Sequence, residues 1–152
     1  MGTRSTVKFY SEFDKEEPVM SVYQQYDGYI DGVGHDLANF LKSKTVINGF
    51  GVEQNMDKGF ANGMGCLAAQ YVAENKTEIG GFYLTTRHDL QEYNYEVRLI
   101  EGNFIIKVRY YDNVFEGTPE ELLNFKEISN IEKRLLEINK IINNNQKKYL
   151  KL

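Results

Sequence analysis

The sequence predicts one α+β domain, in which an antiparallel sheet of two hairpins and a further strand is covered by two helices and followed by a long C-terminal helix. Two pairs of segments alternate apolar and polar residues, which is the pattern of half-buried strands. Two segments between these pairs repeat apolar residues at helical spacing. The end of the chain repeats apolar residues at alternating steps of three and four, which predicts one long helix.

The first predicted hairpin lies at the start of the chain. Residues Thr6–Phe13 alternate, and the strand that they predict has Phe13 on its core-facing side. A charged turn then leads to the returning strand Val19–Tyr26. Gly28 and Gly32 are predicted to break this strand, because glycine permits the positive φ that tight corners need.

The middle of the chain predicts two helices. Apolar residues at helical spacing predict a short helix over residues 34–43, and a second helix over residues 62–75. The core-facing stripe of the second helix would consist of Met64, Leu67, Ala68, Tyr71 and Val72. Glycines and polar residues between the helices, at Val46–Ala61, predict a loop with at most one short strand. A further strand is predicted at Phe82–Thr86.

The second hairpin and the helix after it have strong local signals. Residues Tyr93–Ile100 and Phe104–Tyr111 alternate around a short turn, which predicts two paired strands. Thr118 and Glu121 are spaced as a capping box, in which each side chain binds the other residue's backbone amide. Pro119 fits the first helical position. A helix therefore begins at this point.

The C-terminal segment has the most regular pattern in the chain. Its repeating positions are Ile128, Ile131, Leu135, Ile138, Ile142, Asn145, Tyr149 and Leu152. A helix of about 25 residues is roughly 35 Å long, which exceeds what a small sheet easily covers. We therefore expect two parts, an α+β domain at 1–125 and a C-terminal helix at 126–152 through which the chain forms a homo-oligomer. The alternative is that this helix packs on the chain's own sheet. Asn145 fits self-association, because one polar seam residue can fix the register.

Composition limits the classes of partner. The net charge is −4, but residues 126–152 carry seven Lys or Arg and three Asp or Glu, whereas residues 1–125 carry eleven and nineteen. Such an acidic body disfavours a nucleic-acid polymer as partner, because affinity there comes from neutralising phosphates. No apolar run approaches the roughly 20 residues of a membrane span. The single cysteine, Cys66, excludes an internal disulfide and a cysteine-built zinc site, so we expect a cytoplasmic protein.

The corner after the first hairpin is rich in polar and aromatic residues. The donors Asp27, Asp31, His35 and Asp36 could hold a divalent metal, although they match no recognised ligand spacing. The alternative is that the aspartates stabilise turns and the start of a helix. A third interpretation gives Tyr26, Tyr29 and His35 a ligand-binding role.

A second candidate lies where the helix over residues 62–75 begins. Gly63 and Gly65 would leave backbone amides free to meet an anion at a helix N-terminus. No phosphate-binding glycine motif is completed, and the alternative is that these glycines allow close helix packing. Cys66 could be a nucleophile there, but we expect a small core residue.

Two arginines on the second hairpin form the third candidate. Arg98 and Arg109 lie on its two arms, and a sheet face that carries Arg and Tyr can hold a phosphate and stack a base. The tyrosines nearby are Tyr93, Tyr95, Tyr110 and Tyr111. The alternative is that both arginines pair across strands with glutamates, namely Glu92, Glu96 and Glu101.

Four short motifs suggest a relationship. They are Gly2-Thr-Arg-Ser-Thr6, Tyr23-x-x-Tyr-Asp-Gly-Tyr29, Gly32-x-Gly34 and Leu37-Ala-x-Phe-Leu41. In these motifs the chain resembles a group of small proteins encoded by bacteriophages and large DNA viruses, in which a proline often stands where this chain has Ile30. The resemblance covers about the first 41 residues and transfers no catalytic residue.

The resemblance sets expectations about function. Small phage proteins of mixed sheet and helix include sponges that sequester nucleotide immune signals, which implies a counter-defence role by analogy of type. We therefore expect a non-catalytic binder of a small anionic or nucleotide ligand, without a cofactor. One alternative is a module that inhibits a host protein through an acidic, tyrosine-rich face. Another is a metal-assisted hydrolase that uses the corner aspartates and histidine.

Overall fold

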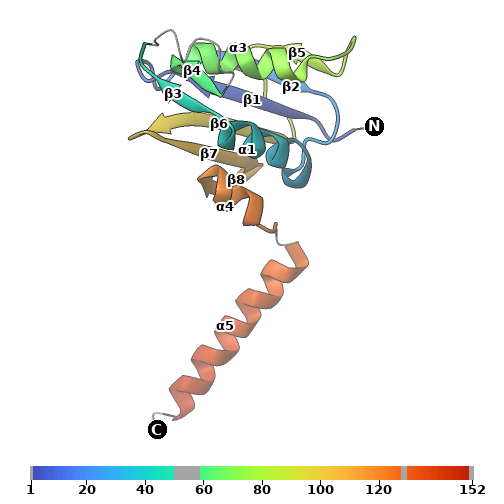
Figure 1. The fold of residues 1–152 in the computed structure, drawn as a ribbon. Coiled ribbons are helices and arrows are strands. Elements are labelled where there is room, and N and C mark those ends of the chain that lie inside the picture. Colours follow the sequence, from blue (N-terminus) through green and yellow to red (C-terminus); the bar gives the residue numbers. More distant parts are fainter. Residues whose placement is uncertain (1, 50–58, 128–129, 151–152) are drawn as a thin grey trace.

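The structure, a computed structural model, describes residues 2–49, 59–127 and 130–150, and it confirms the α+β fold (Figure 1). One six-stranded sheet runs in the order β5-β2-β1-β6-β7-β8. Its strands are β1 (Ser5–Tyr10), β2 (Pro18–Gln24), β5 (Phe82–Leu84), β6 (Tyr93–Ile100), β7 (Asn103–Tyr110) and β8 (Asp112–Gly117). Both predicted hairpins, β1–β2 and β6–β7, are present and antiparallel.

The sheet differs from the prediction in two respects. First, β1 and β6 pair in parallel, so the sheet is mixed rather than wholly antiparallel. No local pattern specifies how two hairpins associate, which is why the sequence did not reveal this pairing. Second, β8 forms an additional edge strand. Its polar composition resembles a loop, and it follows Tyr111, which has a φ of 64°.

The remaining elements lie around this sheet. A π-helix, η1 (Ile30–Gly34), leads directly into α1 (His35–Lys42), and α3 spans Gly63–Asn75. Short strands β3 (Thr45–Ile47) and β4 (Phe60–Asn62) pair in parallel at the two ends of the predicted loop, whose residues 50–58 lie outside the described part of the chain. The helices α4 (Pro119–Asn124) and α5 (Asn130–Leu150) complete the chain.

The core lies between one face of the sheet and the helices α1 and α3. Tyr71 of α3 occupies its centre, with ring centroids 5.2 Å from Phe9, 5.1 Å from Phe40 and 6.0 Å from Phe82. Its hydroxyl accepts a hydrogen bond of 2.8 Å from Gln24 Nε2, so its one polar atom is satisfied. The stripe predicted from helical spacing is thus the stripe that packs on the sheet.

The central strand β1 is buried along its whole length. Lys8 is only 4% exposed, and its ammonium donates a hydrogen bond of 2.7 Å to the backbone oxygen of Asp89 in the loop after β5. Burial lowers the pKa of Lys8 and nearby Arg109 adds to this, whereas Asp89 and Glu96 act in the opposite direction. The predicted strand end was wrong, because β1 stops at Tyr10 and Phe13 is exposed in the following turn.

The glycines of the corner are needed for space, not for positive φ. Asp27 has the positive φ of 56°, whereas Gly28 and Gly32 do not. A Cβ on Gly32 would lie 2.2 Å from the backbone oxygen of Asp27, and one on Gly28 would lie 2.8 Å from the Cβ of Ser5. The corner is therefore a close approach of two backbone segments.

A buried tyrosine fastens this corner to the sheet. The hydroxyl of Tyr95, on β6, donates a hydrogen bond of 2.7 Å to the backbone oxygen of Gly28.

The predicted capping box of α4 is also confirmed, since Thr118 Oγ1 accepts from the Glu121 amide at 3.2 Å while Glu121 Oε1 accepts from the Thr118 amide at 3.1 Å.

Helix α5 extends away from the sheet (Figure 1), so packing on the chain's own sheet is not the arrangement observed. Leu135, Ile138 and Ile142 of the predicted repeat are all about half exposed. The side chains of Ile128, Ile131 and Leu152 lie outside the described part of the structure. Within the described residues, no helix is long and apolar enough to cross a membrane.

We expect Tyr95→Phe to lower the free energy of unfolding by about 1 kcal/mol, because it leaves the buried Gly28 carbonyl without its donor. Urea denaturation monitored by circular dichroism measures this change. Tyr111→Phe, at a residue that is largely exposed, is the matched control and should have no effect. Equal stability of Tyr95→Phe and the parent chain would contradict the fastening role.

Gly32→Ala should destabilise the fold by about 1–3 kcal/mol, because the new methyl group collides with the Asp27 backbone. Gly65→Ala is the matched control in α3, where an added Cβ would meet nothing within 4 Å. Since alanine favours a helix over glycine, that control should be neutral or stabilising by up to about 1 kcal/mol. A stable Gly32→Ala protein in the same denaturation experiment would refute the close-approach explanation.

Candidate functional site

A hollow beside Tyr26 combines an exposed aromatic ring with an arginine. This hollow, which we call the Tyr26 hollow, has a volume of about 410 Å³ and is lined by Gly2, Arg4, Gln25 and Tyr26. Tyr26 is 59% exposed, so much of its ring is open to a ligand. A smaller hollow of about 140 Å³ adjoins the same ring on the side of Gly81. Tyr26 therefore separates two openings.

The backbone around Arg4 is fixed, but its guanidinium is not engaged. The backbone oxygen of Arg4 accepts from the Tyr93 amide at 3.2 Å, and that of Thr3 accepts from the Gly28 amide at 2.9 Å. On the other side of the hollow, the Gln25 amide donates to the Gly81 oxygen at 2.9 Å. Among the residues that the structure describes, the exposed guanidinium of Arg4 has no hydrogen-bond or ion-pair partner. It is thus a cation available beside an open ring.

Arg98 is fully engaged by the protein itself. Its guanidinium lies 3.7 Å from the ring centroid of Tyr10 and pairs with Glu96 at 3.1 Å. It also donates to the backbone oxygen of Lys15 at 3.2 Å. The alternative of pairing with a glutamate therefore describes Arg98 well, although Glu96 is on the same strand rather than across from it.

Arg109 lies on the face of the sheet away from α1 and α3. Register places it opposite Asn94 on β6, and its side chain is exposed. Tyr93, Tyr95 and Tyr110 alternate to the other face of the same strands, where Tyr93 and Tyr110 stack with centroids 4.6 Å apart. The structure therefore does not bring the hairpin arginines together with these tyrosines.

Gly63 and Gly65 stand at the start of α3 without close neighbours. Gly63 has a φ of 83°, a conformation that requires glycine, and an added Cβ on either residue would meet nothing within 4 Å. Within the described part of the chain, therefore, no neighbour packs closely against these glycines. Cys66 is exposed, contrary to the expectation of a core residue, because the buried stripe of α3 passes through Met64 and Leu67 instead.

At the corner, Asp27 is occupied by a neighbouring tyrosine. The hydroxyl of Tyr29 donates to Asp27 Oδ1 at 3.0 Å, and this hydrogen bond raises the pKa of Tyr29. In the described parts of the chain, no three His, Cys, Asp or Glu side chains are placed to hold a metal ion. Asp27, Asp31 and His35 therefore do not form such a group.

Asp31 and His35 instead line a different opening, which we call the corner crevice. It has a volume of about 500 Å³ and lies between Ile30, Asp31 and His35 on one side and residues 123–127 on the other. Glu127, at its edge, accepts a hydrogen bond of 2.9 Å from the hydroxyl of Tyr93. The sequence did not reveal this contact, because Glu127 is remote from the corner along the chain.

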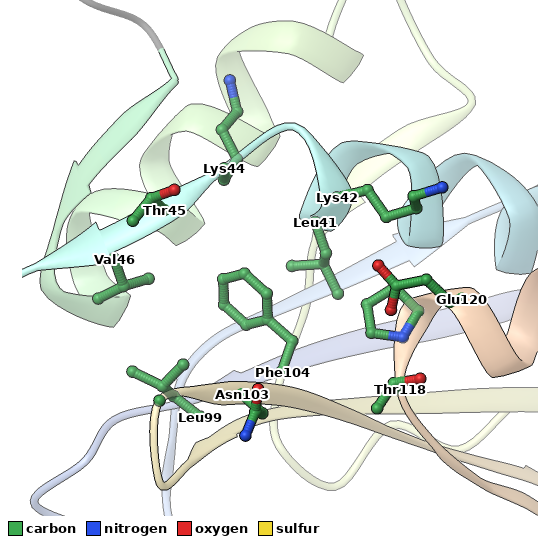
Figure 2. Close-up of a pocket in the computed structure, with 12 residues that line it drawn as sticks. Leu41, Lys42, Lys44, Thr45, Val46, Leu99, Asn103, Phe104, Thr118 and Glu120 are labelled. Atoms are coloured by element: carbon green, nitrogen blue, oxygen red, sulfur yellow. The ribbon is translucent and has the colours of Figure 1, made fainter.

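A third hollow, of about 230 Å³, opens between the end of α1, strand β3, the β6–β7 turn and the start of α4 (Figure 2). Phe104 fills its centre below Leu41, while Lys42 and Glu120 stand on its rim. Lys44 points away from the opening and pairs with Glu74 at 2.7 Å. With opposite charges on its rim and an aromatic ring in its centre, this hollow favours an anion less than the Tyr26 hollow does.

Comparison with known proteins adds no assignment to this geometry: no protein-family model, no curated protein and no solved structure matches the chain.

Proposed function

We propose that this protein is a non-catalytic binder of a small anionic ligand with an aromatic ring, of the nucleotide class, and that it binds this ligand at the Tyr26 hollow. The observation that carries the proposal is the presence of the open Tyr26 ring and the unpartnered Arg4 guanidinium in the lining of one hollow. In the cytoplasm of a phage-infected host, such a protein would act by sequestering a nucleotide signal and so counter host defence.

The chemistry of the two side chains supports this ligand class. Base–aromatic stacking contributes about 1–3 kcal/mol per base, and any base offers a face to the Tyr26 ring. A guanidinium binds a phosphate through two parallel N–H···O bonds, which Arg4 can form because no described side chain occupies it. The described residues that line the hollow include no carboxylate, which favours an anion there.

This proposal keeps one tyrosine of the sequence-based prediction and changes the cation. Arg98 is replaced by Arg4, because Arg98 is engaged by Tyr10 and Glu96. Arg109, Tyr29, His35, Gly63 and Gly65 do not line the Tyr26 hollow, and their ligand-binding roles stay predictions from the sequence.

We also propose that the chain forms a homo-oligomer through α5. The observation that favours this second role is the row of half-exposed aliphatic residues on a helix that extends from the sheet domain (Figure 1). Leu135, Ile138 and Ile142 follow the spacing by which two helices interlock side chains. A sponge gains from this arrangement, because each assembly carries several binding sites.

Nucleotide binding is tested by incubating the purified protein with cyclic and linear nucleotides, removing the protein, and measuring each nucleotide left in solution. The full chain should deplete at least one nucleotide and release it intact on heating. Tyr26→Ala and Arg4→Ala should each weaken binding by about fivefold to a hundredfold, because each removes about 1–3 kcal/mol of stacking or phosphate contact.

Two matched controls locate the site. Tyr111→Ala removes an exposed tyrosine directly after β7, and Arg109→Ala removes an exposed arginine from the sheet, and both should retain binding. If Arg109→Ala abolishes binding while Arg4→Ala does not, the ligand binds the sheet face and the Tyr26 hollow is the wrong site. A chemically altered nucleotide after heating would show an enzyme instead of a binder.

Self-association is tested with the double variant Leu135→Asp and Ile138→Asp. It should reduce the molar mass measured by light scattering to that of a monomer, because charges at neighbouring seam positions cannot be buried. Asn143→Asp with Asn144→Asp adds the same charge away from the seam and should leave the mass unchanged. An unaltered mass for both variants would disprove an α5-mediated assembly.

A further inference from the structure

The corner crevice has the size of a small-molecule site and a composition unlike that of the Tyr26 hollow. Its volume of about 500 Å³ falls within the range of ligand pockets, roughly 300–1,000 Å³. It is built from two distant parts of the chain, namely the corner with the first residue of α1, and the end of α4 with the three residues after it. Tyr95 holds the corner and Tyr93 holds Glu127, and both tyrosines lie on β6. The crevice is therefore formed by the folded sheet domain.

Two carboxylates give the crevice its charge. Asp31 and Glu127 both line it, against one lysine, Lys126. The Glu127 carboxylate is held in place by the Tyr93 hydroxyl at 2.9 Å, and Tyr93 is itself buried and stacked on Tyr110. A carboxylate fixed in this way presents its remaining lone pairs in a constant position.

Both carboxylates also act on one residue, Tyr93. Burial is the main reason why the pKa of Tyr93 is raised far above its usual value, and the hydrogen bond to Glu127 is the next. The charge of Asp31 acts in the same direction. Asp31 and Glu127 therefore both lie within electrostatic reach of the same hydroxyl group.

An imidazole nitrogen supplies the third polar feature. Nε2 of His35, which lines the crevice, is buried and has no hydrogen-bond partner in the described structure. Buried polar atoms are almost always paired, so this nitrogen lacks the partner that such an atom usually has. The apolar part of the lining consists of Ile30, Leu123 and Phe125, and Asn124 is a further polar residue in it. The ring centroids of Phe125 and Phe115 lie 5.1 Å apart.

We propose that the corner crevice binds a small organic cation, namely an amine or a guanidinium carried on a short apolar body. Asp31 and Glu127 accept hydrogen bonds from its cationic groups, and the apolar walls contact its carbon chain. A metal ion does not fit, because the described residues hold no metal-binding group of three such side chains. An anion is disfavoured by the two carboxylates.

This site is separate from the Tyr26 hollow, so each can fail without the other. The test titrates agmatine, which carries an amine and a guanidinium on four methylene groups, into the full chain by calorimetry. Asp31→Asn with Glu127→Gln should weaken agmatine binding by about tenfold or more, since hydrogen bonds to charged groups are lost. Asp112→Asn with Glu116→Gln, on the exposed edge strand β8, removes the same charge elsewhere and should retain binding.

A second measurement requires no variant and so does not depend on the folding of any. In a spectrum of the parent chain with labelled methyl groups, agmatine should shift the resonances of Ile30 and Leu123, while that of Leu84, at the opposite edge of the sheet, stays in place. The absence of agmatine binding would overturn the proposal. Equal weakening in both carboxylate variants would also overturn it, because it would show attraction to overall charge only.

Discussion

Strand β1 pairs with β2 in an antiparallel ladder and with β6 in a parallel one, and this double pairing joins two local hairpins into a single sheet. Every residue of β1 is consequently buried, including Lys8, which must find its partner in the loop after β5. The same pairing aligns β6 so that the hydroxyl of Tyr95 reaches the backbone of Gly28. The corner, the Tyr26 hollow and the corner crevice all depend on this register.

Local patterns in the sequence predicted most of the helices and strands, because alternation and helical spacing report directly which side of a segment is buried. The hairpins, the stripe of α3 and the capping box of α4 belong to this class. The parallel ladder does not, because it joins segments more than eighty residues apart. The edge strand β8 was missed for another reason, since an exposed edge tolerates polar residues that elsewhere indicate a loop.

Residue types alone gave a wrong grouping of the arginines and tyrosines, because the face of the sheet on which each side chain lies also has to be known. Arg98 and Tyr93 lie on one strand at positions of opposite parity, and so do Arg109 and Tyr110 on the next, which already separates them to two faces. Tyr26 could be predicted as a candidate because it stands in a polar corner, but the proximity of Arg4 depends on how the first residues of the chain lie against that corner. The contact between Glu127 and Tyr93 could not be predicted without the path of the chain after α4.

The half-exposed aliphatic residues of α5 have a further consequence for the proposed assembly, since they would make the helicity of α5 depend on the concentration of the protein. A lone helix of such length is marginal in water, because nucleation is unfavourable and each further residue adds little. In the proposed assembly a second copy supplies the missing burial, so the helicity of the segment and the pairing of chains become a single equilibrium under mass action. Under this proposal, dilution would melt the tail and separate the copies, while the sheet domain would keep its fold through its own core.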